Sequence, residues 1–432
     1  MSPTFRSLEN PNYRIWFAAA LVSNIGTWMG RVAQDWVVLT EVTDRSAAAL
    51  GIVTGLQFLP FLLLFPIAGT IADRFPKRTV LAVTQAVLGL TALALALLVA
   101  ADAAQLWHVY AIALVSGVAT AIDNPTRQAF VSEMVPARGL SNAVALNSAS
   151  FNLGRLAGPA AAGLTIAAWG STVALATNAL SFVAVLVALA MIDGSALRPA
   201  PRPRTRPRVL DGVRYVRRRP DILLVLALVF VLGTFGMNFQ ITMALMATEE
   251  FGKGAGEFGL LGSVMAIGSL SAALLSARRE RPRMRVLLLS LAAFVGASGL
   301  AALAPTYPLF ALSLVPVGLS ALTAMTTANA MVQLRSDAAV RGRVMALYTA
   351  VFFGGTPIGA PVVGWIGEVL GPRWTIGIGS IAVGVALVGA WVWLRMVHDL
   401  SVTFDRHRPW ITVAVPAPSM PVRRALDPEP VR

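Results

Sequence analysis

Residues 79–101 read TVLAVTQAVLGLTALALALLVAA and contain no acidic or basic side chain. A stretch of this length matches the roughly 20 residues that an α-helix needs to cross a hydrocarbon layer about 30 Å thick. Similar blocks recur along the chain, in which 56% of the 432 residues are hydrophobic and only 13% are charged. A soluble domain has about 25% charged residues and could not bury this much apolar surface. The composition therefore predicts an all-α membrane protein.

Apolar blocks separated by polar breaks predict twelve transmembrane helices, six on each side of a long polar gap. The predicted spans cover about 15–39, 47–72, 79–101, 107–131, 143–168, 172–193, 222–247, 257–276, 285–304, 308–333, 344–369 and 373–397. We expect a six-helix bundle at 1–195, a basic cytoplasmic linker at 196–220, a second six-helix bundle at 221–398 and a disordered cytoplasmic tail at 399–432.

The distribution of positive charge predicts the orientation in the membrane. With a cytoplasmic N-terminus, the inner segments hold 30 of the 35 Lys and Arg residues, and the outer loops hold only Arg45, Lys253 and Arg373. This positive-inside pattern predicts that both termini are cytoplasmic and that the protein is a multi-pass component of a bacterial-type cytoplasmic (inner) membrane. Orientation alone accounts for the net charge of +14, so we expect lipid and not nucleic acid as a partner.

Residue types that carry catalysis or hold metals are scarce. The chain has no cysteine, and its three histidines are scattered, so no metal centre is predicted. No nucleophile elbow or phosphate-binding loop is present either. We therefore expect neither an enzyme nor a cofactor.

The two halves of the chain resemble each other. At an offset of 201 residues, three glycines of the fifth predicted span and one just after it fall on glycines in and just after the eleventh. The pairs are Gly154 with Gly355, Gly158 with Gly359, Gly163 with Gly364, and Gly170 with Gly371. A parallel six-plus-six repeat is typical of transporters in which two bundles enclose a substrate site near the middle of the membrane.

The loop after the second span reads Gly69-Thr-Ile-Ala-Asp73-Arg74-Phe-Pro-Lys77-Arg78. This sequence resembles the loop signature of the major facilitator superfamily, with Pro76 in place of the usual glycine. The resemblance implies a gating loop formed by Gly69, Asp73, Arg74, Lys77 and Arg78. Gly69 would let two helices approach closely, and Asp73 would pair with basic groups at a helix end.

The fifth span contains Gly154, Gly158, Pro159 and Gly163 in a spacing that resembles the core motif of antiporters, chiefly exporters, in this superfamily. Closely spaced glycines allow tight helix packing, and ordinary packing is the alternative explanation. The N-terminal segment and the region from Trp28 to Trp36 resemble the enterobactin-exporter-like and multidrug-exporter-like bacterial subgroup. Resemblance to this family implies a monomer.

Placing an ionisable residue inside a membrane span costs free energy, so the few that occur in the predicted spans indicate function. Arg31 and Asp35, and likewise Asp123 and Arg127, are spaced for pairing along one helix, and such local ion pairs are one explanation of all four. The other is that Asp35, or less favourably Asp123, takes up a proton in one access state and couples transport to the proton gradient.

The remaining polar residues of these spans suggest partners and a cavity wall. Arg155 has no acid one turn away, so we expect it to pair with Asp35 or Asp123 across the bundle, ahead of binding an anionic group of the cargo. Asn24 and Gln34 are polar neighbours in the first span. The predicted spans of the second half are less polar and contain methionines, whose flexible side chains adapt to irregular apolar shapes. The candidate cavity residues there are Met237, Asn238, Gln240, Met325 and Asn329.

Together these features predict proton-coupled export, by antiport and alternating access, of a lipophilic or amphipathic small molecule such as a drug or secondary metabolite. A symporter or facilitator for a nutrient is the first alternative, and a non-transporting membrane receptor is the second.

Overall fold

The computed structural model describes residues 3–198, 209–277, 282–337, 340–398, 401–404 and 411–414. In the first half, a short 3₁₀ helix, η1 (Pro3–Glu9), precedes six long helices. These are α1 (Pro11–Val37), α2 (Ala47–Arg74), α3 (Lys77–Ala100), α4 (Leu106–Met134), α5 (Ala137–Trp169) and α6 (Ser171–Met191). One π-helical turn, η2 (Val38–Val42), extends α1, and a 3₁₀ turn, η3 (Gly194–Ala196), follows α6.

In the second half, two of the predicted spans are divided. The first consists of α8 (Pro220–Val231), η4 (Leu232–Gly236), α9 (Phe239–Leu245) and η5 (Met246–Glu250). The uninterrupted helices are α10 (Ala255–Ala277), α11 (Met284–Ala302), α12 (Tyr307–Arg335) and α15 (Pro372–His398), and the other divided span consists of α13 (Arg341–Gly354) and α14 (Thr356–Leu370). Part of the predicted linker forms a short helix, α7 (Val209–Arg217), and its residues 199–208 lie outside the described ones.

Ten helical stretches among the described residues are long and apolar enough to cross a membrane. The long elements of the chain are therefore all helices, and the protein crosses the membrane several times. The other two long helices, α1 and α5, carry Arg31, Asp35 and Arg155 and are less apolar. The count of twelve spans, which includes α1 and α5, stays a prediction.

Local sequence explains where several helices begin and end. Asn10 and Ser46 accept backbone hydrogen bonds at the starts of α1 and α2, as N-cap residues do. Gly170 ends α5 and Gly371 ends α14, with φ angles of 85° and 98° that side chains other than glycine rarely adopt. These two glycines are equivalent in the internal repeat, so the duplication extends to the way the helices end.

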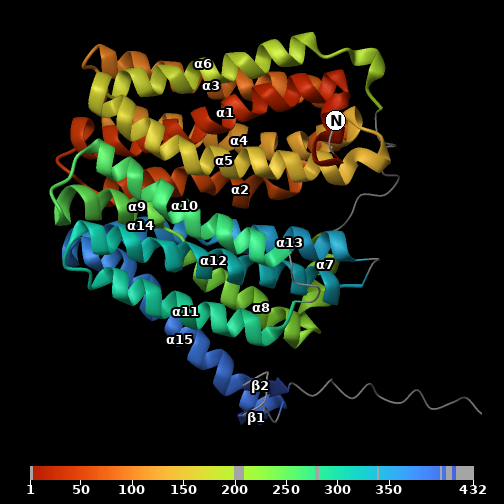
Figure 1. Ribbon diagram of the computed structural model, residues 1–432, viewed down its shortest axis with the longest axis vertical. Coiled ribbons are helices and arrows are strands. Elements are labelled where there is room, and N and C mark those ends of the chain that lie inside the picture. Colours follow the sequence, from red (N-terminus) through yellow and green to blue (C-terminus); the bar gives the residue numbers. More distant parts are fainter. Residues whose placement is uncertain are drawn as a thin grey trace, which may run out of the picture.

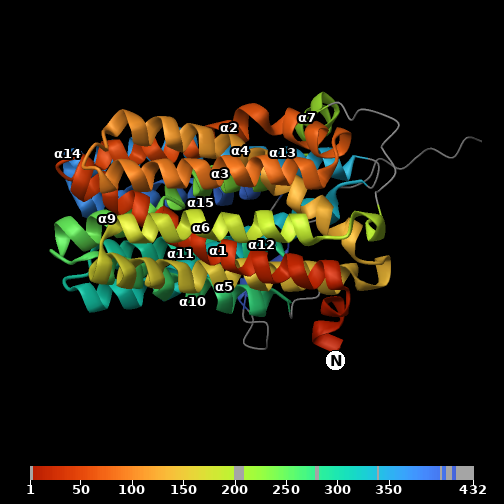
Figure 2. The same ribbon diagram turned by 90° about the horizontal axis from the view of Figure 1, so that it is seen from above.

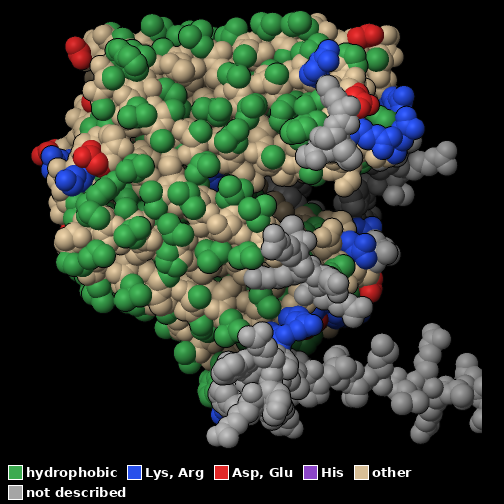
Figure 3. Space-filling view, viewed as in Figure 1, with side chains coloured by type: hydrophobic (Ala, Val, Ile, Leu, Met, Phe, Trp, Pro, Cys, Tyr) green, Lys and Arg blue, Asp and Glu red, His purple; other side chains and the backbone are tan. Residues whose placement is uncertain are grey.

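The two halves of the chain lie one above the other, with α1 to α6 in the upper half and α8 to α15 in the lower half of Figure 1. Most helices run in roughly the same direction, as the perpendicular view in Figure 2 also shows. The halves meet mainly where α2 packs on α14 and α5 packs on α10. Basic side chains, the N-terminal helix and α7 gather at one end of the molecule, here called the arginine-rich end (Figures 1 and 3).

The tail beyond 398, for which we expected no fixed structure, contains two short strands. β1 (Ser401–Phe404) and β2 (Ile411–Ala414) pair antiparallel, with Ser401 opposite Ala414. The rest of the predicted tail lies outside the described residues.

Candidate substrate cavity

A cavity of about 1640 Å³ lies between the two halves. Its wall is formed by α1, α2, α4 and α5 from the first half and by residues of α9, α10, α12 and α13 from the second. A volume above the usual range of small-molecule sites, about 300–1,000 Å³, leaves room for a bulky ligand with water around it.

At the end of the molecule opposite the arginine-rich end, contacts between the halves close the cavity. Glu368 of α14 accepts hydrogen bonds from Ser46 Oγ and Ala48 N at the start of α2, at 3.0 and 2.9 Å. A Cβ atom at Gly259 of α10 would overlap the carbonyl oxygen of Pro159 in α5. The backbones of the two halves therefore touch here without intervening side chains. We call this region the closed end.

Toward the arginine-rich end, the lining residues include Gly69, Asp73 and Arg74 of α2 and Gly342 and Arg343 of α13. The space-filling view in Figure 3 shows a hollow between the halves at this end. The cavity is thus accessible from the arginine-rich end and blocked at the closed end.

Asp123 on α4 is fully occupied by neighbouring donors. Its Oδ1 accepts hydrogen bonds of 2.8 Å from both Thr84 Oγ1 and Gln85 Nε2 of α3, and its Oδ2 accepts one of 3.0 Å from Arg127 Nε. The predicted local ion pair with Arg127 is confirmed. Thr84 and Gln85, which the sequence reasoning missed, were visible as the two adjacent polar residues in the apolar stretch 79–101.

Asp35 on α1 has different surroundings. It is 4% exposed, lines the cavity and leaves its Oδ2 without a hydrogen-bond partner among the described residues. Arg31 and Asp35 interact electrostatically but do not form the predicted salt bridge in this conformation, where the guanidinium lies over the rings of Trp28 and Phe58, at 5.2 and 5.8 Å from their centroids. The carboxyl group of Asp35 is therefore buried without an ion-pair partner.

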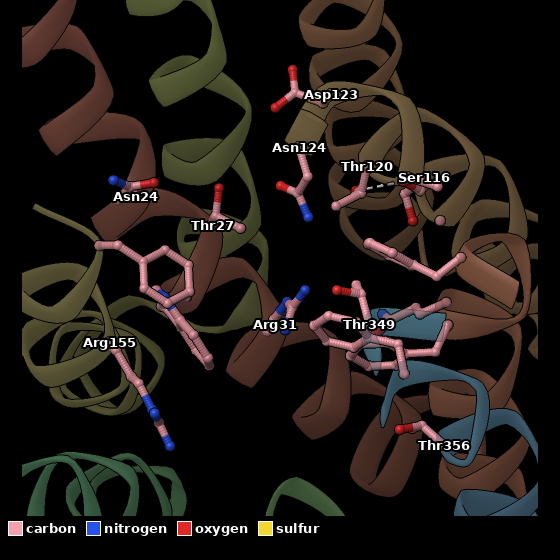
Figure 4. A pocket seen from close by; sticks show the side chains of 18 of the residues that line it. Asn24, Thr27, Arg31, Ser116, Thr120, Asp123, Asn124, Arg155, Thr349 and Thr356 are labelled. Carbon is pink, nitrogen blue, oxygen red and sulfur yellow. Dashed lines mark hydrogen bonds between the residues drawn. The ribbon is translucent and has the colours of Figure 1, made fainter. Parts of the chain in front are cut away.

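Arg155 on α5 does not form the predicted cross-bundle pair with Asp35 or Asp123. Its guanidinium lies 5.8 Å from the centroid of the Trp28 ring, so the same indole contacts two cations. Both Arg31 and Arg155 line the cavity (Figure 4). The prediction failed because Asp123 is taken up by Arg127 and its α3 donors, while a nearby aromatic face offered the cation another contact.

Two further polar residues of the first helix also line the cavity. Asn24 donates a hydrogen bond of 2.9 Å to Ser150 Oγ of α5. Gln34 leaves its side-chain nitrogen unpartnered among the described residues. The structure therefore brings these polar side chains of α1 to one wall.

On the opposite wall, four of the five predicted residues of the second half line the cavity. They are Met237, Asn238, Gln240 and Met325, whereas Asn329 is not among the lining residues. Met237 and Asn238 lie at the break between η4 and α9, and Gln240 follows within α9. Asn238 donates to Thr234 O at 2.7 Å and leaves its own Oδ1 without a partner among the described residues. Broken helices that expose polar atoms to a cavity are a common feature of transporter binding sites.

The predicted gating-loop residues occupy separate positions. Gly69, Asp73 and Arg74 line the open part of the cavity. The expectation that Gly69 lies at a close helix crossing is wrong here, since a Cβ atom at this position would meet no atom within 4 Å. Lys77 instead forms a largely buried ion pair of 2.7 Å with Glu133 of α4, and Arg78 donates to Ala190 O of α6 at 3.0 Å. Glu133 was missed because its partner lies in another helix.

The glycines of α5 pack tightly, as predicted. A Cβ atom at Gly154 or Gly158 would come within 3 Å of α1 atoms, and one at Gly163 would lie 2.6 Å from the carbonyl oxygen of Ala255 in α10. Pro159 also contacts Gly259 and Gly262 of α10. Gly154 and Gly158 thus pack against α1 within the first half, whereas Pro159 and Gly163 pack against α10 of the second half.

A group of phenylalanines, which sequence reasoning missed, lies beside Arg31. Phe353 of α13 stacks on Phe58 and Phe61 of α2, with ring centroids 6.0 and 5.3 Å apart, and Phe352 contacts Phe353 edge to face. All four line the cavity. The rings come from both halves, so neither sequence segment alone reveals the group.

Two repeated helical halves around a cavity that opens at one end define the class of secondary transporters of the major facilitator type. Solved structures with this fold include the nucleoside transporter NupG, with a TM-score of 0.70, 14% identity and coverage of 88% of this chain and 99% of that one. A D-xylose-proton symporter aligns with a TM-score of 0.67 and 12% identity over 88% of this chain and 97% of its own.

The sequence matches the transmembrane secretion effector family over residues 2–422, and the chain belongs to that family. Curated relatives include the enterobactin exporter EntS of Shigella boydii, 26% identical over 89% of this chain and 93% of the relative. The staphyloferrin A transporter of Staphylococcus aureus is 27% identical over 60% of this chain and 66% of its own length. The chain is thus a membrane transporter of this superfamily and not an enzyme.

Proposed function

We propose that this protein exports a siderophore-like or similar amphipathic small molecule across the bacterial cytoplasmic membrane, by alternating access and in exchange for protons. In this proposal it is a monomer with twelve spans, and both termini and the arginine-rich end are cytoplasmic. The observation that carries the proposal is the large cavity between the halves, which is open at the arginine-rich end and contains a carboxyl group without an ion-pair partner.

The relatives support the direction and the class of cargo. The names of EntS and of the staphyloferrin A transporter assign siderophores to those proteins. In the orientation that the positive-inside rule favours, the cavity faces the cytoplasm, where an exporter loads its cargo. The phenylalanines and methionines of the wall suit the apolar part of such a molecule.

Asp35 is the proposed proton carrier, ahead of Asp123. A carboxyl group can exchange protons with the medium when its surroundings alternate between a water-filled and a closed cavity. Asp35 lines the cavity and has a free oxygen, whereas both oxygens of Asp123 are bound by neighbouring donors. Proton exchange at Asp35 therefore disrupts fewer contacts.

Transport in everted membrane vesicles tests the proposal, with enterobactin and staphyloferrin A as probes. Acidifying the vesicle interior should drive accumulation of at least one probe, and Asp35→Asn should reduce it to the level of vesicles without the protein. Asp35→Glu should retain part of the activity. Asp193→Asn is the matched control, because Asp193 lies outside the cavity and its carboxyl group accepts hydrogen bonds from Ser195 and Ala196.

Two outcomes contradict the proposal. Full proton-driven accumulation by Asp35→Asn would exclude this residue as the carrier. Uptake of a nutrient along with protons in right-side-out vesicles, without export of either probe, would favour the symporter alternative.

A further inference from the structure

Arg31 and Arg155 place two guanidinium groups in the cavity, and among the described residues neither forms a salt bridge with an acidic side chain, although Asp35 acts on Arg31 electrostatically. Building on the proposed export function, we infer that these two arginines and Trp28 between them form a binding subsite for an anionic group of the cargo. The cargo class is accordingly an organic anion, such as a carboxylate or a catecholate, attached to an aromatic or other apolar body.

The acids that line the cavity are not available to the two arginines. Asp123 is held by Arg127, and Asp73 lies at the mouth of the cavity on α2. Asp35 is one helical turn from Arg31 but does not form an ion pair with it. Within the described residues, neither Arg31 nor Arg155 donates a hydrogen bond to another side chain or to the backbone. An incoming anion therefore does not have to displace a protein partner.

Trp28 orients both cations. The guanidinium carbons of Arg31 and Arg155 lie 5.2 and 5.8 Å from the indole centroid, and Arg31 also contacts the ring of Phe58. A cation–π contact uses the charge of the guanidinium and no N–H hydrogen bond, so the N–H groups can still bind a carboxylate in a bidentate manner. The aromatic contacts thus hold the arginines without consuming the donors that would recognise an anion.

The surroundings of Arg31 indicate the rest of the ligand. Phe58, which contacts Arg31, is stacked on Phe353, and Phe61 packs against the same ring. An anion on Arg31 would have its apolar body against these rings, where an aromatic ligand can stack. Thr349 of α13 also lines the cavity (Figure 4).

The inference is tested by equilibrium binding of two matched probes, 2-naphthoate and its neutral analogue 2-naphthamide, to the purified full-length protein in lipid nanodiscs. Isothermal titration should show at least a tenfold tighter Kd for the anion, because charge-assisted bonds to guanidinium groups are absent with the amide. Arg31→Gln and Arg155→Gln should each reduce this preference several-fold. Arg31→Lys and Arg155→Lys, which keep the charge, should retain part of it.

Arg395→Gln is the control, because Arg395 also lies over a tryptophan, 3.9 Å from the Trp391 centroid, but is exposed on α15 outside the cavity. Its preference for the anion should equal that of the wild type. Equal binding of both probes by the wild type, binding of neither, or an unchanged preference in both glutamine variants would overturn the inference. Because no transport is measured, these outcomes are independent of whether export or proton coupling is confirmed.

Discussion

Asp35 and Asp123 line the same cavity, but their carboxyl groups are placed for different tasks. Asp123 accepts three hydrogen bonds, one of them from a charged partner, whereas Asp35 has an oxygen without any partner among the described residues. Ionised side chains with complete sets of donors stabilise the packing around them. Asp123 thus connects α3 and α4, and Asp35 is free to change its protonation state.

Replacing Asp123 with asparagine should lower stability more than the same change at Asp35. Asp123→Asn leaves the largely buried Arg127 without a counter-ion, a loss that costs about 3–5 kcal/mol at buried pairs. Asp35→Asn removes a charge that has no ion-pair partner. Thermal unfolding of the detergent-purified variants measures the difference. Equal melting temperatures for the two variants would contradict these assignments.

Sequence spacing predicted the position of the charged residues but not all of their partners. Residues one turn apart share a helix face, and this was sufficient for Asp123 with Arg127. It failed for Arg31 with Asp35, because Trp28 and Phe58 offer the flexible arginine side chain a competing aromatic contact. Partners from other helices, such as Glu133 for Lys77, depend on tertiary packing that a single sequence does not reveal.

At the scale of helices, glycines determine how closely neighbours can pack. Gly359 of α14 lies against the backbone of η4, and a Cβ atom there would overlap the carbonyl oxygen of Thr234. Gly389 of α15 has no atom within 4 Å of such a position. The two glycines lie within long helices but differ in what surrounds them.

We therefore expect opposite effects from two alanine substitutions. Gly359→Ala should destabilise the protein by about 1–3 kcal/mol, since a rigid backbone atom has to move. Gly389→Ala should be neutral or stabilise by up to about 1 kcal/mol through better helix propensity. The melting temperatures of the two variants, each compared with the wild type, test this. A Gly359→Ala variant as stable as Gly389→Ala would show that α14 can shift away from η4 at little cost.

Apolar length was enough to predict ten helical stretches that can cross a membrane, because lipid tolerates only segments whose backbone is hydrogen-bonded internally. The breaks were harder to predict. The division at Met237 and Asn238 and the one at Gly355 are set by packing between helices, and α5 stays continuous although it is the repeat equivalent of the divided α13 and α14. Periodicity alone does not distinguish a continuous helix from one broken at a binding site.

At the scale of the whole molecule, alternating access requires that the closed end opens while the arginine-rich end closes. Contacts at the closed end include close backbone approaches, the hydrogen bonds that Ser46 and Ala48 donate to Glu368, and an ion pair of 3.7 Å between Arg45 and Glu249. Buried apolar side chains of both halves also pack together here, so the closed end is held by side chains as well as by close backbone approaches. Its stability should therefore respond to small changes in backbone distance.

Gly259→Ala should open the closed end, because the added methyl group overlaps Pro159 across the interface between halves. The chain has no cysteine, so Thr120→Cys, at a position that lines the cavity, provides a single reporter. The reference protein carries Thr120→Cys alone. In right-side-out vesicles, an impermeant maleimide should label its cysteine slowly. Labelling should be several-fold faster when Gly259→Ala is added, since the cavity then opens to the outside. Gly296→Ala, which meets no atom within 4 Å, is the control and should leave the rate unchanged. Fast labelling of the reference protein from outside would place the arginine-rich end outside the cell, and an unchanged rate with Gly259→Ala would show that this glycine contact does not hold the closed end.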